Sequence, residues 1–231
     1  SGLHIEHVGQ EALDDVEVGI RPSTNGEDGE TSVDGWLQQI ARLEPGDIWN
    51  CRDVRIEFPK EELAQLDERQ TTELEVTLGV GDSPGHQTDF TVSRLPYNQW
   101  PGVSVFPQSL AAFVLPNHPD VVEVTTRMRD IMERWTGSGS LDGYQSNRDR
   151  VRKLVASSYA ALLELGFSYV NPPASFERNG QKVRTPEQML NTRMGTCLDL
   201  TLLLAAAMEH IGLRPLLVVI EGHAFVGAWL E

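Results

Sequence analysis

The stretch Arg193-Met194-Gly195-Thr196-Cys197-Leu198-Asp199-Leu200 runs directly into an almost wholly apolar segment that ends at Gly212. Thr196 is a favourable N-cap residue, so we expect a core helix whose first turn carries Cys197. The N-terminus of a helix has free N–H groups and partial positive charge, and both stabilise a thiolate. His223 follows on a predicted strand, just after a turn at Glu221-Gly222. An imidazole beside the thiolate would complete an activated nucleophile.

Cys197 and His223 are therefore the candidate catalytic residues. Each also has a purely structural interpretation, because a free cysteine often behaves as a small buried apolar residue and a single histidine often belongs to the core. His210 stands near the far end of the predicted helix, about 20 Å from Cys197 along its axis, so it is not expected to be the partner. Asp199 is expected to complement the helix dipole, and His118 is expected to be structural.

These residues resemble the core motif of the transglutaminase-like superfamily, a branch of the papain-like cysteine fold. The matching segments are Gly195-Thr196-Cys197-Leu198-Asp199, Gly212-Leu213-Arg214-Pro215 and His223-Ala224-Phe225-Val226. The resemblance covers about residues 119–231. It implies a domain of that fold in which an Asp on the strand after the histidine orients the imidazole. The sequence ends at Glu231 without such an Asp, so we expect a domain truncated at its C-terminus or an incomplete triad.

The chemistry implied is acyl transfer or hydrolysis at a peptide or amide carbonyl of a protein or peptide substrate. The Cys197 N–H would be one oxyanion donor, and Gln145, Asn171 and Gln188 are polar candidates for the second. Protease, deamidase and transglutaminase activities all remain open. The alternative is a catalytically inactive interaction or regulatory module. The connector described below and the segment from Gly195 to Leu200 also resemble N-terminal regions of large bacterial helicase-like proteins, which implies other domains in a longer parent chain.

The pattern along the chain predicts an α+β protein with two domains. Residues 1–96 alternate apolar and polar side chains, as in Val16-Glu17-Val18 and in the segments 54–58, 74–78 and 90–92, which indicates an Ig-like β-sandwich. An acidic loop is expected over residues 22–30, and a helical turn over 59–66. Residues 97–118 form a Pro-rich connector. Residues 119–231 form the second domain, with helices over 121–135, 148–165 and from 186, a long loop over 169–183, and a hairpin over 216–230.

The amino-acid composition argues against several classes of function. A net charge of −15 over 231 residues argues against direct binding of nucleic acid by this segment. We expect neither a signal peptide nor a membrane span, and a cytoplasmic location. The two cysteines, Cys51 and Cys197, make no disulfide framework. No His or Cys pairs stand at metal-ligand spacing, so neither a metal nor a cofactor is expected.

Overall fold

The computed structural model describes residues 2–22, 35–81 and 83–231. Helix and strand are present in nearly equal shares, 33% and 32%, and the strands pair mainly in antiparallel sheets, so the predicted α+β class is confirmed. The chain divides into two compact units, one ending at Tyr97 and one running from Asn98 to Glu231. Most of the predicted acidic loop, residues 23–30, lies outside the described residues.

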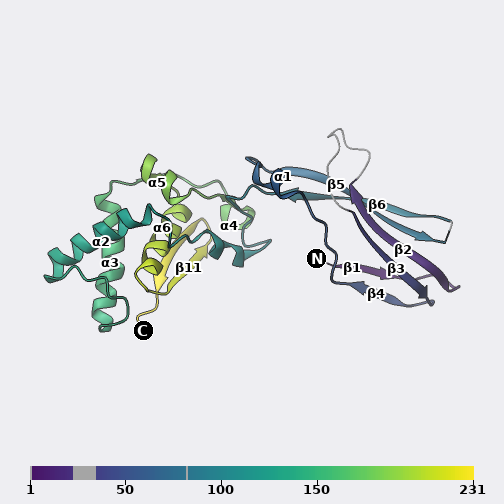
Figure 1. Cartoon of the computed structure of the whole chain (residues 1–231), viewed down its shortest axis with the longest axis horizontal. Coiled ribbons are helices and arrows are strands. Elements are labelled where there is room, and N and C mark those ends of the chain that lie inside the picture. Colours follow the sequence, from purple (N-terminus) through teal and green to yellow (C-terminus); the bar gives the residue numbers. More distant parts are fainter. Residues whose placement is uncertain (1, 23–34, 82) are drawn as a thin grey trace. The chain divides into compact units, whose positions relative to one another are not determined.

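The first unit is built on a four-stranded antiparallel sheet in the order β3-β2-β5-β6 (Figure 1). Its strands are β2 (Leu13–Pro22), β3 (Trp36–Leu43), β5 (Gln70–Val80) and β6 (Ser83–Arg94). A separate pair, β1 (Leu3–Glu6) with β4 (Ile48–Cys51), packs its apolar side chains against Val16 and Val18 of β2. Two antiparallel sheets therefore share one core, since alternate side chains of each strand point to the same face.

One predicted strand of this unit is wrong. Residues 54–58 form no strand apart from a single bridged residue, Glu57. The side chains of Val54, Ile56 and Phe58 nevertheless line one apolar pocket together with residues of β5 and β6. The alternation of apolar and polar residues therefore predicted correctly which side chains are buried together. The backbone of this segment, however, does not join a sheet. The predicted helical turn that follows is confirmed as α1 (Lys60–Ala64).

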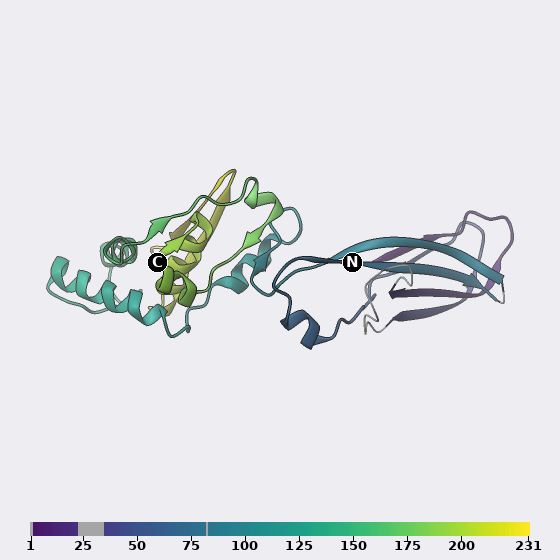
Figure 2. The same ribbon diagram turned by 90° about the horizontal axis from the view of Figure 1, so that it is seen from above.

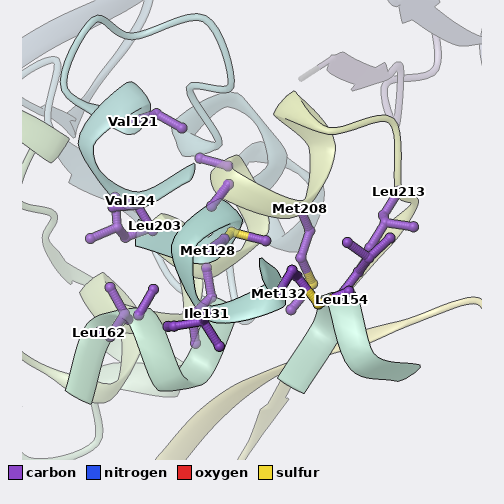
Figure 3. Packing of buried hydrophobic residues seen from close by; sticks show 14 of the residues in the cluster. Val121, Val124, Met128, Ile131, Met132, Leu154, Leu162, Leu203, Met208 and Leu213 are labelled. Carbon is purple, nitrogen blue, oxygen red and sulfur yellow. The ribbon is translucent and has the colours of Figure 1, made fainter. Parts of the chain in front are cut away.

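The second unit is organised around α6 (Cys197–His210), which is buried on nearly all sides. Helices α2 (Val121–Thr136) and α3 (Arg148–Glu164) pack against it. The hairpin of β11 (Pro215–Ile220) and β12 (His223–Ala228) also lies beside α6, as both Figure 1 and Figure 2 show. These helices and the hairpin confirm the sequence prediction, with ends that differ by at most two residues. Figure 3 shows the buried side chains of this core, among them Val124, Met128, Ile131, Leu154, Leu203 and Met208.

The segment predicted as a Pro-rich connector belongs to the second unit from Asn98 onward. Strand β7 (Gln99–Trp100) pairs with β9 (Gln181–Lys182), and the 3₁₀ helix η1 (Pro107–Phe113) follows. Trp100 is fully buried, and Leu110 lies in the same apolar cluster as Cys197. Two bulky apolar side chains therefore make the segment part of a core, although its prolines suggested an extended linker. The predicted loop over 169–183 also contains the short helix α4 (Phe176–Asn179).

The packing around α3 provides a direct test of the second core. Leu154 is fully buried on this helix, whereas Leu163 on the same helix is 66% exposed. We expect Leu154→Ala to lower the free energy of unfolding by about 2–5 kcal/mol, because a cavity is left in a packed core. Leu163→Ala should change it by less than about 0.5 kcal/mol. Denaturant unfolding followed by far-UV circular dichroism measures both, and equal losses would contradict the packing described.

Candidate active site

Cys197 is the first residue of α6, as the sequence predicts, and the helix start is closed by a capping box. The hydroxyl of Thr196 accepts a hydrogen bond from the N–H of Asp199 at 3.2 Å. In return, the Asp199 carboxylate accepts from the N–H of Thr196 at 2.9 Å. Within the described part of the chain, the N–H groups of Cys197 and Leu198 have no hydrogen-bond partner. Two free donors therefore remain beside the thiol.

Asp199 does more than complement the helix dipole, which was the sequence interpretation. The residue is completely buried, and its carboxylate also accepts hydrogen bonds from the backbone N–H of Arg184 at 2.9 Å and from the Arg184 guanidinium at 2.7 Å. A buried carboxylate is tolerated when an opposite charge and hydrogen bonds compensate for lost hydration. The ion pair thereby ties the segment before α5 (Pro186–Thr192) to the start of α6.

The residues just before Cys197 are held by a short parallel ladder. Strand β10 (Met194–Gly195) pairs with β8 (Ser168–Tyr169), and the N–H of Val170 donates to the Gly195 carbonyl at 2.9 Å. A Cβ added at Gly195 would lie 2.9 Å from the Met189 side chain and 3.3 Å from Cβ of Asp199. Protein side chains therefore pack closely around Gly195, and a larger residue here would require the end of the flexible Met189 side chain to shift.

Cys197 and His223 line the same pocket, which has a volume of about 420 Å³. One wall is a stripe along α6 at helical spacing: Cys197, Leu200, Thr201, Leu204 and Met208. Residues of α3 and Tyr169 of β8 also line the pocket. Four consecutive residues of β12, from His223 to Val226, also line it. Because successive side chains of a strand point to opposite faces, this pocket must run along the edge of β12.

The two candidate catalytic residues differ sharply in exposure. Cys197 is only 3% exposed and belongs to an apolar cluster that includes Ala224. Ala224 points into the core, so His223 and Phe225 point to the other face, where their rings stack with centroids 6.3 Å apart. No hydrogen bond among the described residues joins the His223 ring to Cys197. The structure brings the two residues to one pocket, and their direct sulfur–imidazole contact stays a prediction.

Sequence reasoning missed Tyr169. This tyrosine lines the pocket of Cys197, and about half of its side chain is exposed. The pKa of its phenol is raised above the ordinary value, first by partial burial and then by interaction with the Cys197 side chain. Nothing in the spacing of Tyr169 and Cys197 suggests this, because their meeting in one pocket depends on the pairing of β8 with β10. A short apolar segment after Gly166 was the only signal available.

None of the three amides proposed as oxyanion donors is among the described residues that line this pocket. Gln145 is exposed in the turn before α3. Asn171 and Gln188 line a different pocket of about 720 Å³, where Oε1 of the Gln188 side chain accepts from the N–H of Thr185 at 3.1 Å in the capping box of α5. In that second pocket, the buried Gln181 donates to the Thr196 hydroxyl at 2.8 Å. Gln181 therefore supports the N-cap of α6, a role that no sequence pattern indicated.

The other histidines and the second cysteine are not among the residues that line this pocket. His210, at the C-terminal end of α6, is hydrogen-bonded through Nδ1 to the Pro116 carbonyl at 2.7 Å. His118 accepts from the N–H of Asp120 through Nδ1 at 3.3 Å, just before α2. Both therefore have structural partners. Cys51 is a free, half-buried cysteine in β4 of the first unit.

In the described part of the chain, no three His, Cys, Asp or Glu side chains come together in a way that could hold a metal ion. No helix there combines the length and the apolar character needed to cross a bilayer.

Comparison with models of known protein families finds none that matches this chain. A search of curated proteins likewise finds no match. The resemblance to the transglutaminase-like group therefore rests on the motif residues alone, and the activity it implies is a proposal.

The buried ion pair at the start of α6 can be tested against an exposed counterpart. Asp149 also lies in the first turn of a helix and pairs with Arg152, but this pair is largely exposed. We expect Asp199→Ala to cost about 2–3 kcal/mol of stability, because it removes a helix cap and leaves buried donors without an acceptor. Asp149→Ala should cost less than about 1 kcal/mol. Thermal and denaturant unfolding measure the difference, and similar costs for both would refute a special role for Asp199.

Proposed function

We propose that this protein catalyses cysteine-dependent acyl transfer or hydrolysis at a peptide or amide carbonyl. Cys197 is the proposed nucleophile and His223 the proposed base. The observation that carries the proposal is the position of Cys197: first residue of a capped helix, beside unpaired N–H groups, on a pocket that also reaches His223. The free N–H groups and the helix dipole both favour negative charge at this point.

The proposed reaction proceeds in two displacements. His223 takes the thiol proton, and the Cys197 sulfur attacks the carbonyl carbon, so that a C–S bond forms and the carbonyl electron pair moves to oxygen. The free N–H groups at the start of α6 stabilise this oxyanion. The C–N bond then breaks, and the departing amine or ammonia takes the proton from His223. Water or a second amine attacks the thioester, releases Cys197 and so completes hydrolysis or transfer.

The finer architecture is part of the same proposal. Residues 119–231 are proposed to be a transglutaminase-like domain, supported by the order of the cysteine helix, the Gly212 turn and the hairpin that bears His223. The first unit is proposed to be an Ig-like sandwich, supported by its two antiparallel sheets with a shared core. An Asp that would orient His223 is not among the described residues of the pocket.

The pocket also suggests what the substrate is like. Its α6 wall is mainly apolar, and three partly exposed aromatic side chains, Tyr159, Tyr169 and Phe225, line it as well. We therefore propose a protein or peptide substrate with apolar groups next to the reacting carbonyl. A net charge of −15 disfavours a nucleic acid as a direct partner of this segment. The two free thiols favour a reducing, cytoplasmic location.

A second candidate function is an inactive interaction or regulatory module of a larger protein. The observation in its favour is the near-complete burial of Cys197 together with the outward orientation of His223. On this alternative, the pocket persists as a binding groove after the loss of catalysis.

Alkylation of the two cysteines separates these functions. We expect iodoacetamide to modify Cys197 about tenfold faster than Cys51 at pH 7, because the helix N-terminus and His223 favour the thiolate. Peptide-resolved mass spectrometry on the folded protein between pH 6 and 9 gives both rates.

Replacement of His223 by Ala should slow the reaction of Cys197 alone. His210→Ala is the matched control, since His210 is exposed at the opposite end of the same helix. Equal rates for both cysteines, unaffected by His223→Ala, would favour the inactive module.

A further inference from the structure

The backbone holds Tyr169 beside the start of α6. In the parallel pairing of β8 with β10, Tyr169 is in register with Gly195, only two residues before Cys197. Hydrogen bonds on either side of this pair fix the register, from Ser168 N–H to the Arg193 carbonyl at 2.7 Å and from Val170 N–H to the Gly195 carbonyl. The tyrosine is therefore positioned by the same ladder that leads the chain into the catalytic helix.

Few titratable groups share the pocket with the Tyr169 hydroxyl. They are Cys197 from α6, His223 from β12 and Tyr159 from α3. The raised pKa of Tyr169 means that the phenol keeps its proton at neutral pH. A neutral phenol beside a thiolate can donate a hydrogen bond to it, and such charge-assisted bonds are the stronger ones.

We propose that Tyr169 is a catalytic donor of this site, whose hydroxyl donates a hydrogen bond first to the Cys197 thiolate and then to the oxyanion formed at the attacked carbonyl. The inference rests on the proposed acyl-transfer function. It adds a side-chain oxyanion donor to the free N–H groups at the start of α6, a role for which none of Gln145, Asn171 and Gln188 is in the pocket.

The two roles are compatible in geometry. In the tetrahedral intermediate, the sulfur and the oxyanion are bonded to the same carbon. The negative charge therefore moves from the sulfur to an oxygen atom that lies close to it. A hydroxyl that reaches the sulfur can reach this oxygen by a small rotation of the side chain. The phenol proton stays on Tyr169 throughout, since proton transfer is assigned to His223.

The first test is independent of any substrate. The ultraviolet absorbance of phenolate, titrated with pH in the folded protein and in Tyr169→Phe, gives by difference the ionisation midpoint of Tyr169. Cys197→Ala should lower this midpoint by about half a pH unit or more, because it removes a neighbouring thiolate that opposes phenolate formation. An unchanged midpoint would overturn the inference.

The second test measures the thiol. Tyr169→Phe keeps the aromatic ring and removes only the hydroxyl, so we expect alkylation of Cys197 at pH 7 to slow by about tenfold, the usual value of a hydrogen bond to a charged group. Tyr97→Phe is the control, because Tyr97 is an exposed tyrosine of the first unit that is not among the residues lining this pocket, and it should leave the rate unchanged. Circular dichroism establishes that both variants fold.

The outcomes separate the two proposals. A Cys197 that is fast in the wild type and slowed by His223→Ala, yet unaffected by Tyr169→Phe, would overturn the donor role and leave the proposed function standing. A Cys197 no faster than Cys51, with a Tyr169 midpoint that still falls in Cys197→Ala, would overturn the proposed function, and with it the catalytic role of Tyr169. That result would support only the hydrogen bond between the two side chains.

Discussion

The second unit depends on a buried charge, the carboxylate of Asp199. It accepts hydrogen bonds from Thr196, which caps α6, and from Arg184, which comes from the preceding segment. A carboxylate with no access to water is stable only while all these donors are in place. The start of α6 therefore has one well-defined arrangement, and Cys197, two residues before Asp199, takes its position from it.

Three further constraints meet at the same point. Gln181 hydrogen-bonds to the Thr196 hydroxyl, the β8–β10 ladder holds Gly195, and the Met189 side chain packs closely against Gly195. Each comes from a different part of the chain, so the site is held by tertiary contacts on several sides. Precise positioning of this kind is what an activated nucleophile needs. It is equally what a rigid binding groove would need, which is why chemical reactivity has to decide between the two.

The sequence predicted the elements of the second unit well. Its helices and hairpin are apolar or amphipathic segments bounded by glycine, proline or polar residues, and Thr196 marks the start of α6 by a local rule of helix capping. The sequence predicted the structure less well where one pattern of residues is compatible with two different structures. Val54, Ile56 and Phe58 alternate as in a strand, but alternation records only which side chains are buried together. The prolines after residue 95 suggested a linker, although Trp100 is buried in the second core.

The sequence by itself determined that Cys197 begins an apolar helix and that His223 follows on a hairpin, because capping and periodicity are local properties of neighbouring residues. Only the tertiary structure decided what surrounds the thiol. The placement of Tyr169 in the same pocket, the ion pair of Asp199 with Arg184 and the outward direction of His223 all depend on how separate segments pack. Such contacts join residues far apart in the chain, and no local spacing rule encodes them.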